Sequence, residues 1–435
     1  MIINICATGD SLFCAGFPAE YRKIRGALDD FIGGCGVRMT NLETNISDFG
    51  GFACRYSGGT WLNTPPGIFH HLESFGFNFF GTANNHCMDY SYAGLLSTID
   101  FLDRAGYAHA GTGRSLDEAS RPAVVRLDCG ATAAIFAVDT SMESPSMAGE
   151  AGGVFEARPG VSYLRHESVF HVSTRDMLKL KKIAGRCGVN FTRDGEIASG
   201  YMLPDRDGIF VLGQTAFTDN PDEPASRCNK ADLERLTCLF RKAKEENDLV
   251  FLLVHCHDEE APDESAPPAY LKEFCRAAIN AGCDAVFGGG EHSMRGMELY
   301  RGRPVFYSLG DFIYQGMRVG HLPPDFMRKY GLDVNATAEE GLAARSKGGK
   351  IGLQTDEKNF LTVVPKITFE NGAVADITLM PVKLGFRTGN PELDGLPFFA
   401  EGEEGVRIFE RFRALSEPFG VSMEMKDGMI KVLTE

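Results

Sequence analysis

The sequence lacks long apolar runs and has too few basic residues to balance its acids. Its longest apolar stretches, such as LVFLLV at residues 249–254, are far too short to span a bilayer. Its 44 lysines and arginines face 59 aspartates and glutamates, which gives a formal net charge of −15. This charge argues against nucleic acid or an anionic membrane as the main partner. It leaves an anionic substrate possible, because a bound metal reverses the local field.

The twelve cysteines lack the spacing of a zinc cluster or a disulfide framework, since no Cys-x-x-Cys occurs. Cys6, Cys129, Cys238 and Cys275 lie in apolar runs and are expected to be buried free thiols. The first segment, MIINICATGDSLF, has neither a basic leader nor a small-residue cleavage site, and it is typical of a core strand. Together these features predict a cytoplasmic protein.

Strands and helices alternate along most of the chain. Buried strands are expected near residues 2–9, 37–44, 77–86, 248–259 and 283–292, and amphipathic helices near 21–32, 67–76, 92–106, 175–188, 230–247, 269–282 and 405–420. Hairpins are expected at 123–140, at 296–312 with a turn at Arg301–Gly302, and at 359–382 with a turn at Asn371–Gly372. This order predicts an α/β fold with a mostly parallel sheet covered by helices.

Polar side chains that can bind metals follow five of these strands. They are Asp10, then Asn41 and Glu43, then Asn85 and His86, then His255 and His257, and finally Glu291 and His292. In open α/β sheets, sites form at the carboxyl ends of the strands. This mixture of oxygen and imidazole ligands suits Mn²⁺, Fe or Zn²⁺, often as a two-metal hydrolytic centre.

Each of these residues alone also has a structural explanation. Asp10 could cap a helix, Glu43 could be a solvated turn carboxylate, and His292 could be structural. Asn85 and His86 could belong to a capped turn. His255 and His257 alternate on one strand and face the same side, which is uncommon for core packing. The joint occurrence at five strand ends favours a metal site.

At these residues the sequence resembles the capsule-biosynthesis protein A, or poly-γ-glutamate synthesis, family, a branch similar to the calcineurin-like metallophosphatases. The matching stretches run in family order from near residue 8 to near residue 315. They are TGDSLF, NLET, SGGTWLNTPP, ANNHCMDYSYAGLLSTIDFLDRAGYAHAGTG, RPGVSYLR, HCHDE and GMELYRGRPVFYSLGDFIYQ.

The resemblance implies a four-layer α/β/β/α sandwich with a dinuclear site at one edge. Residues 1–315 would form the catalytic domain, with a loop insertion near 139–165. Residues 316–357 form a polar excursion, and residues 358–435 would complete the sandwich with hairpins and a helix.

The resemblance also implies a role for each site residue. Asp10 and His292 would bind the first of two divalent ions (Mn, Zn or Fe), and Glu43 would bridge both ions. The second ion would be bound by Asn85 and bound or bordered by His255 and His257. His86 would lie beside the leaving group as the catalytic acid or electrostatic group.

The family commonly has Gly-His-x-Pro-His where this chain has GGGEH at residues 288–292. Gly289 therefore stands in place of the first histidine, and Glu291 in place of proline. This departure predicts a weaker second metal site, which Gly289→His is expected to tighten unless only glycine fits there.

Two functions follow from these expectations. The first is a metal-dependent hydrolase in which metal-activated water attacks a γ-glutamyl amide or a phosphoester, with Arg158 and Arg165 gripping an anionic small-molecule or oligomeric substrate. The second is a non-catalytic binding or assembly protein of polymer biosynthesis with a degraded metal site, as the altered GGGEH suggests. A serine nucleophile is disfavoured because no Gly-x-Ser-x-Gly elbow occurs. The oligomeric state stays open.

Overall fold

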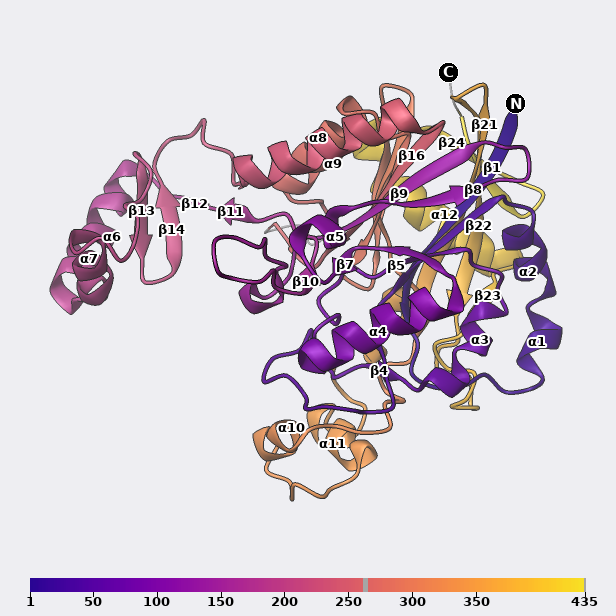
Figure 1. The fold of residues 1–435 in the computed structure, drawn as a ribbon, viewed down its shortest axis with the longest axis horizontal. Coiled ribbons are helices and arrows are strands. Elements are labelled where there is room, and N and C mark those ends of the chain that lie inside the picture. The colour runs from indigo at the N-terminus through magenta and orange to yellow at the C-terminus, as the bar shows by residue number, and fades with distance from the viewer. Residues whose placement is uncertain (261–264, 434–435) are drawn as a thin grey trace.

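The computed structural model describes residues 1–260 and 265–433 as a mixed α/β structure built around two large sheets (Figure 1). This confirms the α/β class predicted from the sequence. In the described residues, no helix combines the length and the apolar character that a membrane span requires.

The larger sheet has ten strands, and β1 (Ile2–Leu12) lies near its centre. It pairs in parallel with β2 (Val37–Leu42) and β20 (Asp311–Tyr314), and antiparallel with β21 (Leu361–Glu370). The other strands are β5 (Phe79–Gly81), β6 (Ala108–Ala110), β22 (Ala373–Leu384), β23 (Pro397–Phe399), β24 (Met423–Lys426) and β25 (Met429–Val432). Because β1, β2 and β5 run parallel, their carboxyl ends meet at one edge of the sheet.

The smaller sheet has six strands in the order β18-β19-β17-β16-β9-β8. Its parallel centre contains β9 (Thr132–Asp139), β16 (Leu249–Cys256) and β17 (Ala285–Gly290). β19 (Arg303–Leu309) continues the parallel order, and the edges are β8 (Ala123–Arg126) and β18 (Met294–Tyr300). The hairpin turns at Arg301–Gly302 and at Asn371–Gly372 are as predicted, and both residues of each turn have positive φ.

Alternating side chains on the strands build separate cores on the two faces of each sheet. Ile5 and Phe251 belong to a core shared by the two sheets. On the outer face of the larger sheet, Cys6 packs with residues of the helices α2 (Gly26–Gly33), α3 (His70–Glu73) and α4 (Ser91–Ala105). On the outer face of the smaller sheet, Leu252 packs with α8 (Lys230–Glu246) and α9 (Ala269–Asn280).

A separate arm stands away from the two sheets at the left of Figure 1. It contains β12 (Phe170–His171), α6 (Thr174–Cys187), α7 (Phe191–Ala198), β13 (Ile209–Leu212) and β14 (Thr215–Thr218). β11 (His166–Ser168) and β15 (Ser226–Cys228) pair where the chain leaves the main body and returns to it. The sequence predicted α6 but not α7.

Several local expectations need correction. The helix expected at 21–32 breaks into α1 (Tyr21–Ile24) and α2 at the buried Arg25, whose guanidinium bonds Asp29 and Ser74. The helix expected at 67–76 shortens to a 3₁₀ turn and α3. Cys129 and Cys238 are exposed rather than buried, because they lie in the β8–β9 turn and on α8.

The remaining helices lie around the edges of the sheets. The excursion at 316–357 contains α10 (Pro324–Lys329) and α11 (Ala338–Arg345). α12 (Gly402–Ser416) packs on β18 and β22, and the short α5 (Leu116–Ser120) lies beside β7 (Thr112–Gly113). The stretch 139–165 forms a 3₁₀ turn at Ser144–Ser146 and β10 (Gly160–Val161), and β10 pairs with β7.

Candidate metal centre

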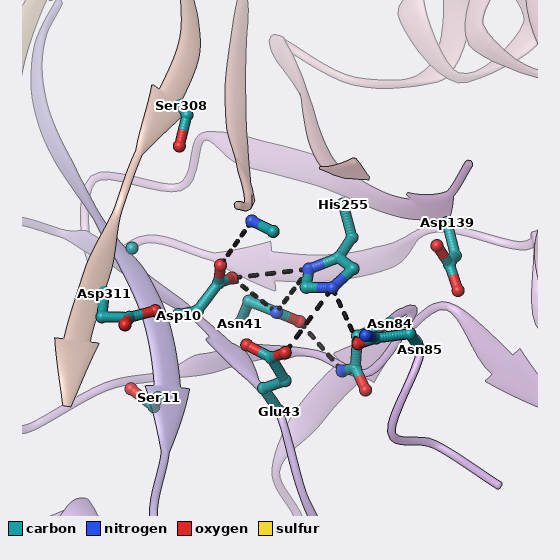
Figure 2. A network of polar contacts seen from close by, with 12 residues as sticks. Asp10, Ser11, Asn41, Glu43, Asn84, Asn85, Asp139, His255, Ser308 and Asp311 are labelled. Atoms are coloured by element: carbon teal, nitrogen blue, oxygen red, sulfur yellow. Dashed lines mark hydrogen bonds and ion pairs between the residues drawn. The ribbon is translucent and has the colours of Figure 1, made fainter. Parts of the chain in front are cut away.

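The carboxyl ends of strands from both sheets converge on one buried cluster (Figure 2). Asp10 lies in β1, Glu43 directly follows β2, and His255 lies in β16. Asn85 and His86 follow β5, His257 follows β16, and His292 lies between β17 and β18. The structure therefore brings together all seven metal-ligating and catalytic residues proposed from the sequence.

The ligand atoms fall into two groups that share Glu43. Asp10, Glu43 and His255 form one group, and Glu43, His257 and His292 form the other. Within each group one ligand atom per residue lies within 4.8 Å of the others. His255 Nδ1 is 3.7 Å from Asp10 Oδ1, and His255 Nε2 is 3.6 Å from Glu43 Oε1. A carboxylate common to both groups has the position of a bridging ligand.

This division differs from the one that the resemblance implies. Asp10 groups with His255, and His292 groups with His257, whereas the resemblance pairs Asp10 with His292. His255 and His257 are two residues apart at the end of β16 and face the same side, and their Nε2 atoms lie 3.1 Å apart. Asn85 lies between them, with Oδ1 3.0 Å from His255 Nε2 and Nδ2 2.9 Å from His257 Nε2.

Glu43 is a fully buried carboxylate, and neither of its oxygens accepts a hydrogen bond from the described residues. Burial, together with the nearby carboxylates of Asp10 and Asp311, raises its pKa well above the ordinary value. An unpaired buried charge is costly, so such a group is either protonated or neutralised by a cation. The orphaned oxygens of Glu43 fit a metal site.

Two other ligand candidates, Asp10 and His257, are held in forms that suit metal binding. Burial raises the pKa of Asp10, but the neighbouring imidazole of His255 and hydrogen bonds from Asn41 and Gly290 outweigh it and lower the pKa overall. Burial and neighbouring histidines lower the pKa of His257 well below the ordinary value, so its ring is neutral and offers a lone pair.

His86 contacts the cluster without belonging to either group. Its Nδ1 lies 2.6 Å from Asp89 Oδ2, and its Nε2 lies 3.8 Å from Glu43 Oε1. Asp89 is fully buried and also accepts the backbone N–H of Leu62 at 2.7 Å. This fixed carboxylate orients the ring so that Nε2 faces the cluster.

Three further residues support the cluster: Asn41, which the sequence analysis placed among the strand-end side chains, and Asn84 and Asp311, which it did not assign to the site. Asp311 lies 3.0 Å from His292 Nδ1 and fixes the orientation of that ring. Asn41 donates to Asp10 at 2.6 Å, and Asn84 donates to Asn41 at 3.2 Å. Asn41 stands at a strand end, and Asp311 lies in the SLGDF stretch that resembles the family. Their places in the sequence could therefore have indicated a role in the site.

The two arginines proposed to grip the substrate are engaged elsewhere. Arg165 Nε and Nη2 donate to Asp232 at 2.7 and 2.8 Å in a bidentate pair. Arg158 is exposed, and its Nε donates to the carbonyl of Met147 at 3.0 Å. In the described residues no hydrogen bond or ion pair joins either arginine to the cluster.

Gly289 allows the backbone to pass directly against Asp10. A Cβ at this position would lie 2.5 Å from Asp10 Oδ1 and 2.6 Å from Oδ2, and the next residue, Gly290, donates its N–H to Oδ2 at 2.6 Å. A side chain at 289 would therefore displace the carboxylate, which is the exception stated for Gly289→His: glycine is what fits against Asp10 here. Glu291 pairs with Arg295 instead of joining either group.

Parallel strands that carry carboxylates and imidazoles to one buried edge define an α/β protein with a candidate metal centre. The family model described as bacterial capsule synthesis protein PGA_cap matches residues 4–316. The chain belongs to this family, as the resemblance in its sequence indicated.

Several curated proteins are similar to this chain. The uncharacterized protein y4uA of Sinorhizobium fredii is 32% identical over 99% of this chain and 93% of its own length. A probable polyglutamine synthesis accessory protein of Mycobacterium tuberculosis is 25% identical over 65% of this chain and 57% of its own length. The PGA biosynthesis protein CapA of Bacillus subtilis is 32% identical over 19% of this chain and 21% of its own length.

Gly289→Ala is expected to loosen metal binding. The added methyl group forces Asp10 away from Asn41 and Gly290, and this disturbs the group that contains Asp10. Metal content per chain after dialysis against a mild chelator should fall below that of the wild type. Gly33→Ala, where an added Cβ meets no atom within 4 Å, serves as the control. Equal retention in both variants would show that the close approach is unimportant.

Asp139 gives a pH-dependent stability that can be tested without metal. Burial raises its pKa from 3.8 to about 6. The folded state therefore holds this proton longer than the unfolded state, and stability falls as pH rises from 3.8 to about 6. In chelator-treated protein, Asp139→Asn should remove up to roughly 3 kcal/mol of this fall. Urea unfolding at pH 4 and 7 measures it, with the exposed Asp128→Asn as control. Equal pH dependence in wild type and Asp139→Asn would contradict the assignment.

Proposed function

We propose that this chain is a metal-dependent hydrolase acting on an amide of γ-glutamyl type or on a phosphoester. Glu43 carries the proposal, because it is a buried carboxylate without hydrogen bonds and is shared by two groups of ligand atoms. The cores between the sheets and on their outer faces support a four-layer α/β/β/α sandwich like that of the metallophosphatases.

The residues of the two groups would hold two divalent ions, of Mn, Zn or Fe. One ion would be held by Asp10, Glu43 and His255, and the other by Glu43, His257 and His292, with Asn85 within reach of both. When bound, such ions supply an activated water and stabilise the negative charge that develops at the attacked bond.

His86 is the group of this chain that is best placed to move a proton. Asp89 accepts a hydrogen bond from Nδ1, so a second proton on the ring must be carried at Nε2, the atom that faces the cluster. From that position protonated His86 would donate to the leaving group or stabilise its charge. Asp89 keeps the ring oriented during the transfer.

The second candidate is a non-catalytic binding or assembly protein of polymer biosynthesis. Two observations favour it: Gly289 replaces an expected histidine, and one relative carries the name of an accessory protein. In both cases we propose a cytoplasmic protein of capsule or poly-γ-glutamate metabolism whose partner is a small or oligomeric anionic substrate. The absence of disulfides among the described cysteines supports that location.

Glu43→Gln separates the two candidates. The amide keeps the shape of the side chain but loses the charge that holds two cations, so at least one ion per chain and all turnover should be lost. Metal analysis, together with turnover of p-nitrophenyl phosphate and of γ-glutamyl peptides, measures both effects. The exposed Glu370→Gln is the control. Wild-type protein without metal or turnover after purification with Mn²⁺ or Zn²⁺ would favour the binding protein.

His86→Asn should lower kcat by about a hundredfold to ten-thousandfold while metal content stays unchanged, because His86 moves a proton and binds no ion. Steady-state kinetics and metal analysis on the same preparation test this. His70→Asn, at an exposed histidine, is the control. Loss of metal together with turnover would make His86 a ligand and contradict its proposed role.

A further inference from the structure

A second polar cavity lies beside the turn that carries His292. It has a volume of about 260 Å³, and its lining includes Glu259, Glu291, Ser293, Asn359 and Arg411. It shares Arg411 with a wider groove of about 1230 Å³ lined by residues of α9 and α12. Glu291 and Ser293 flank His292 in the sequence, so the cavity and the candidate metal centre share one turn.

Glu291, which lines the cavity, belongs to a buried ion pair with Arg295 that has unused hydrogen-bonding capacity. The Glu291 side chain is only 6% exposed, and neither of its oxygens accepts a hydrogen bond from the described residues. Arg295 Nη1 lies 2.9 Å from Glu291 Oε2 in an ion pair, while its Nη2 donates to the carbonyl of Asp258. Arg295 Nε and Nη1 make no hydrogen bond to the described residues. Buried polar groups of this kind usually have a partner.

The remaining charges of the lining include both signs. Asp356 Oδ2 lies 3.5 Å from Lys358 Nζ, so these two charges offset each other. Between residues 1–260 and 265–433, no ion pair is formed by Glu259 or by Arg411, and Arg411 Nε is buried without an acceptor. Among the described residues, Glu259 and Arg411 are therefore one carboxylate and one guanidinium of the lining without an ion-pair partner. An anion alone would leave the carboxylate unmatched, and a cation alone would leave the guanidinium unmatched.

We propose that this cavity binds the zwitterionic head group of an α-amino acid. The ligand carboxylate would pair with Arg411, and the ammonium group would lie toward Glu259 and Glu291. A volume of about 260 Å³ is below the usual range of roughly 300–1,000 Å³ for drug-sized ligands, which suits one amino-acid unit. The head group could belong to a free amino acid or to the end of a γ-glutamyl chain. The γ-glutamyl chain as a ligand rests on the proposed hydrolase function, whereas binding of an amino-acid head group in this cavity does not.

Calorimetric titration of chelator-treated protein with L-glutamate tests the site independently of metal and turnover. L-Glutamate should bind, whereas N-acetyl-L-glutamate, which lacks the ammonium group, and γ-aminobutyrate, which lacks the α-carboxylate, should bind at least about tenfold more weakly. Failure of the wild-type protein to bind L-glutamate at millimolar concentration would overturn the proposal, whatever the result of the hydrolase assays.

Arg411→Met should weaken L-glutamate binding by at least about tenfold, because it removes the charge-assisted contact to the carboxylate. Glu259→Gln should also weaken L-glutamate binding, because it removes the negative charge that faces the ammonium group of the ligand. Arg413→Met lies on the same helix, α12, outside the cavity lining, and should bind like the wild type. Equal affinity in wild type and in both cavity variants would also overturn the proposal.

The two ligand sources are distinguished by kinetics with a γ-glutamyl dipeptide. If the head group is part of the substrate, Arg411→Met raises KM by about the factor by which it weakens L-glutamate binding, and kcat changes little. If the ligand is a free amino acid acting at a separate site, KM for the dipeptide stays unchanged while L-glutamate binding is lost. Either result supports the head-group site and assigns its ligand.

Discussion

The arrangement of strand ends centres on one buried carboxylate, that of Glu43, which no described residue satisfies with a hydrogen bond. Glu43 follows a parallel strand near the centre of the larger sheet and has no solvent exposure and no hydrogen-bond partner in the described chain. Asp10, Asp311 and Asp139 raise its pKa further. Cations bound between these carboxylates and the neighbouring imidazoles would lower the electrostatic cost, which explains why so many acids are buried at one edge.

The supporting residues follow from the same constraint. Two ligand candidates, Asp10 and His292, each have one side committed to a fixed partner. Asp10 is held by Asn41 and Gly290, and His292 is held by Asp311. Such contacts fix the rotamers before any ion arrives, so little reorganisation accompanies binding. His292 has a φ of 62°, an unusual conformation for a non-glycine residue, as is common at functional sites.

The sequence predicted the parts of this site that depend on local position. Buried strands are short apolar runs, and the residues directly after them are visible without a structure, which is how Asp10, Glu43 and His255 were found. The division of the ligands into two groups was not predictable from the sequence, because it depends on the distances between ligand atoms in the folded protein. Arg165 shows the same limit: its partner Asp232 lies 67 residues away in the sequence.

For the fold as well, features that depend on local sequence were predictable and features that depend on distant residues were not. Alternating and apolar segments predicted the strands of the smaller sheet and β1, β2, β5, β21 and β22 of the larger one, with two hairpin turns, because these signals are local. The break at Arg25 was missed, because a buried arginine bonded to Ser74 interrupts an otherwise good helical pattern. The arm was predicted only as separate elements, since nothing local indicates that it stands away from the sheets.

The polar excursion at 316–357 also has a place in this arrangement. Trp61 packs against Phe326 of α10 with ring centroids 6.2 Å apart, and Arg345 at the end of α11 bonds Thr60. These contacts hold the loop around Gly58, where an added Cβ would collide with Asn85 and His86. The excursion lies almost entirely beyond the family match, which ends at residue 316, yet it packs against a loop that borders the candidate centre. A segment outside the matched region therefore supports one border of the candidate centre through the loop at residues 58–61.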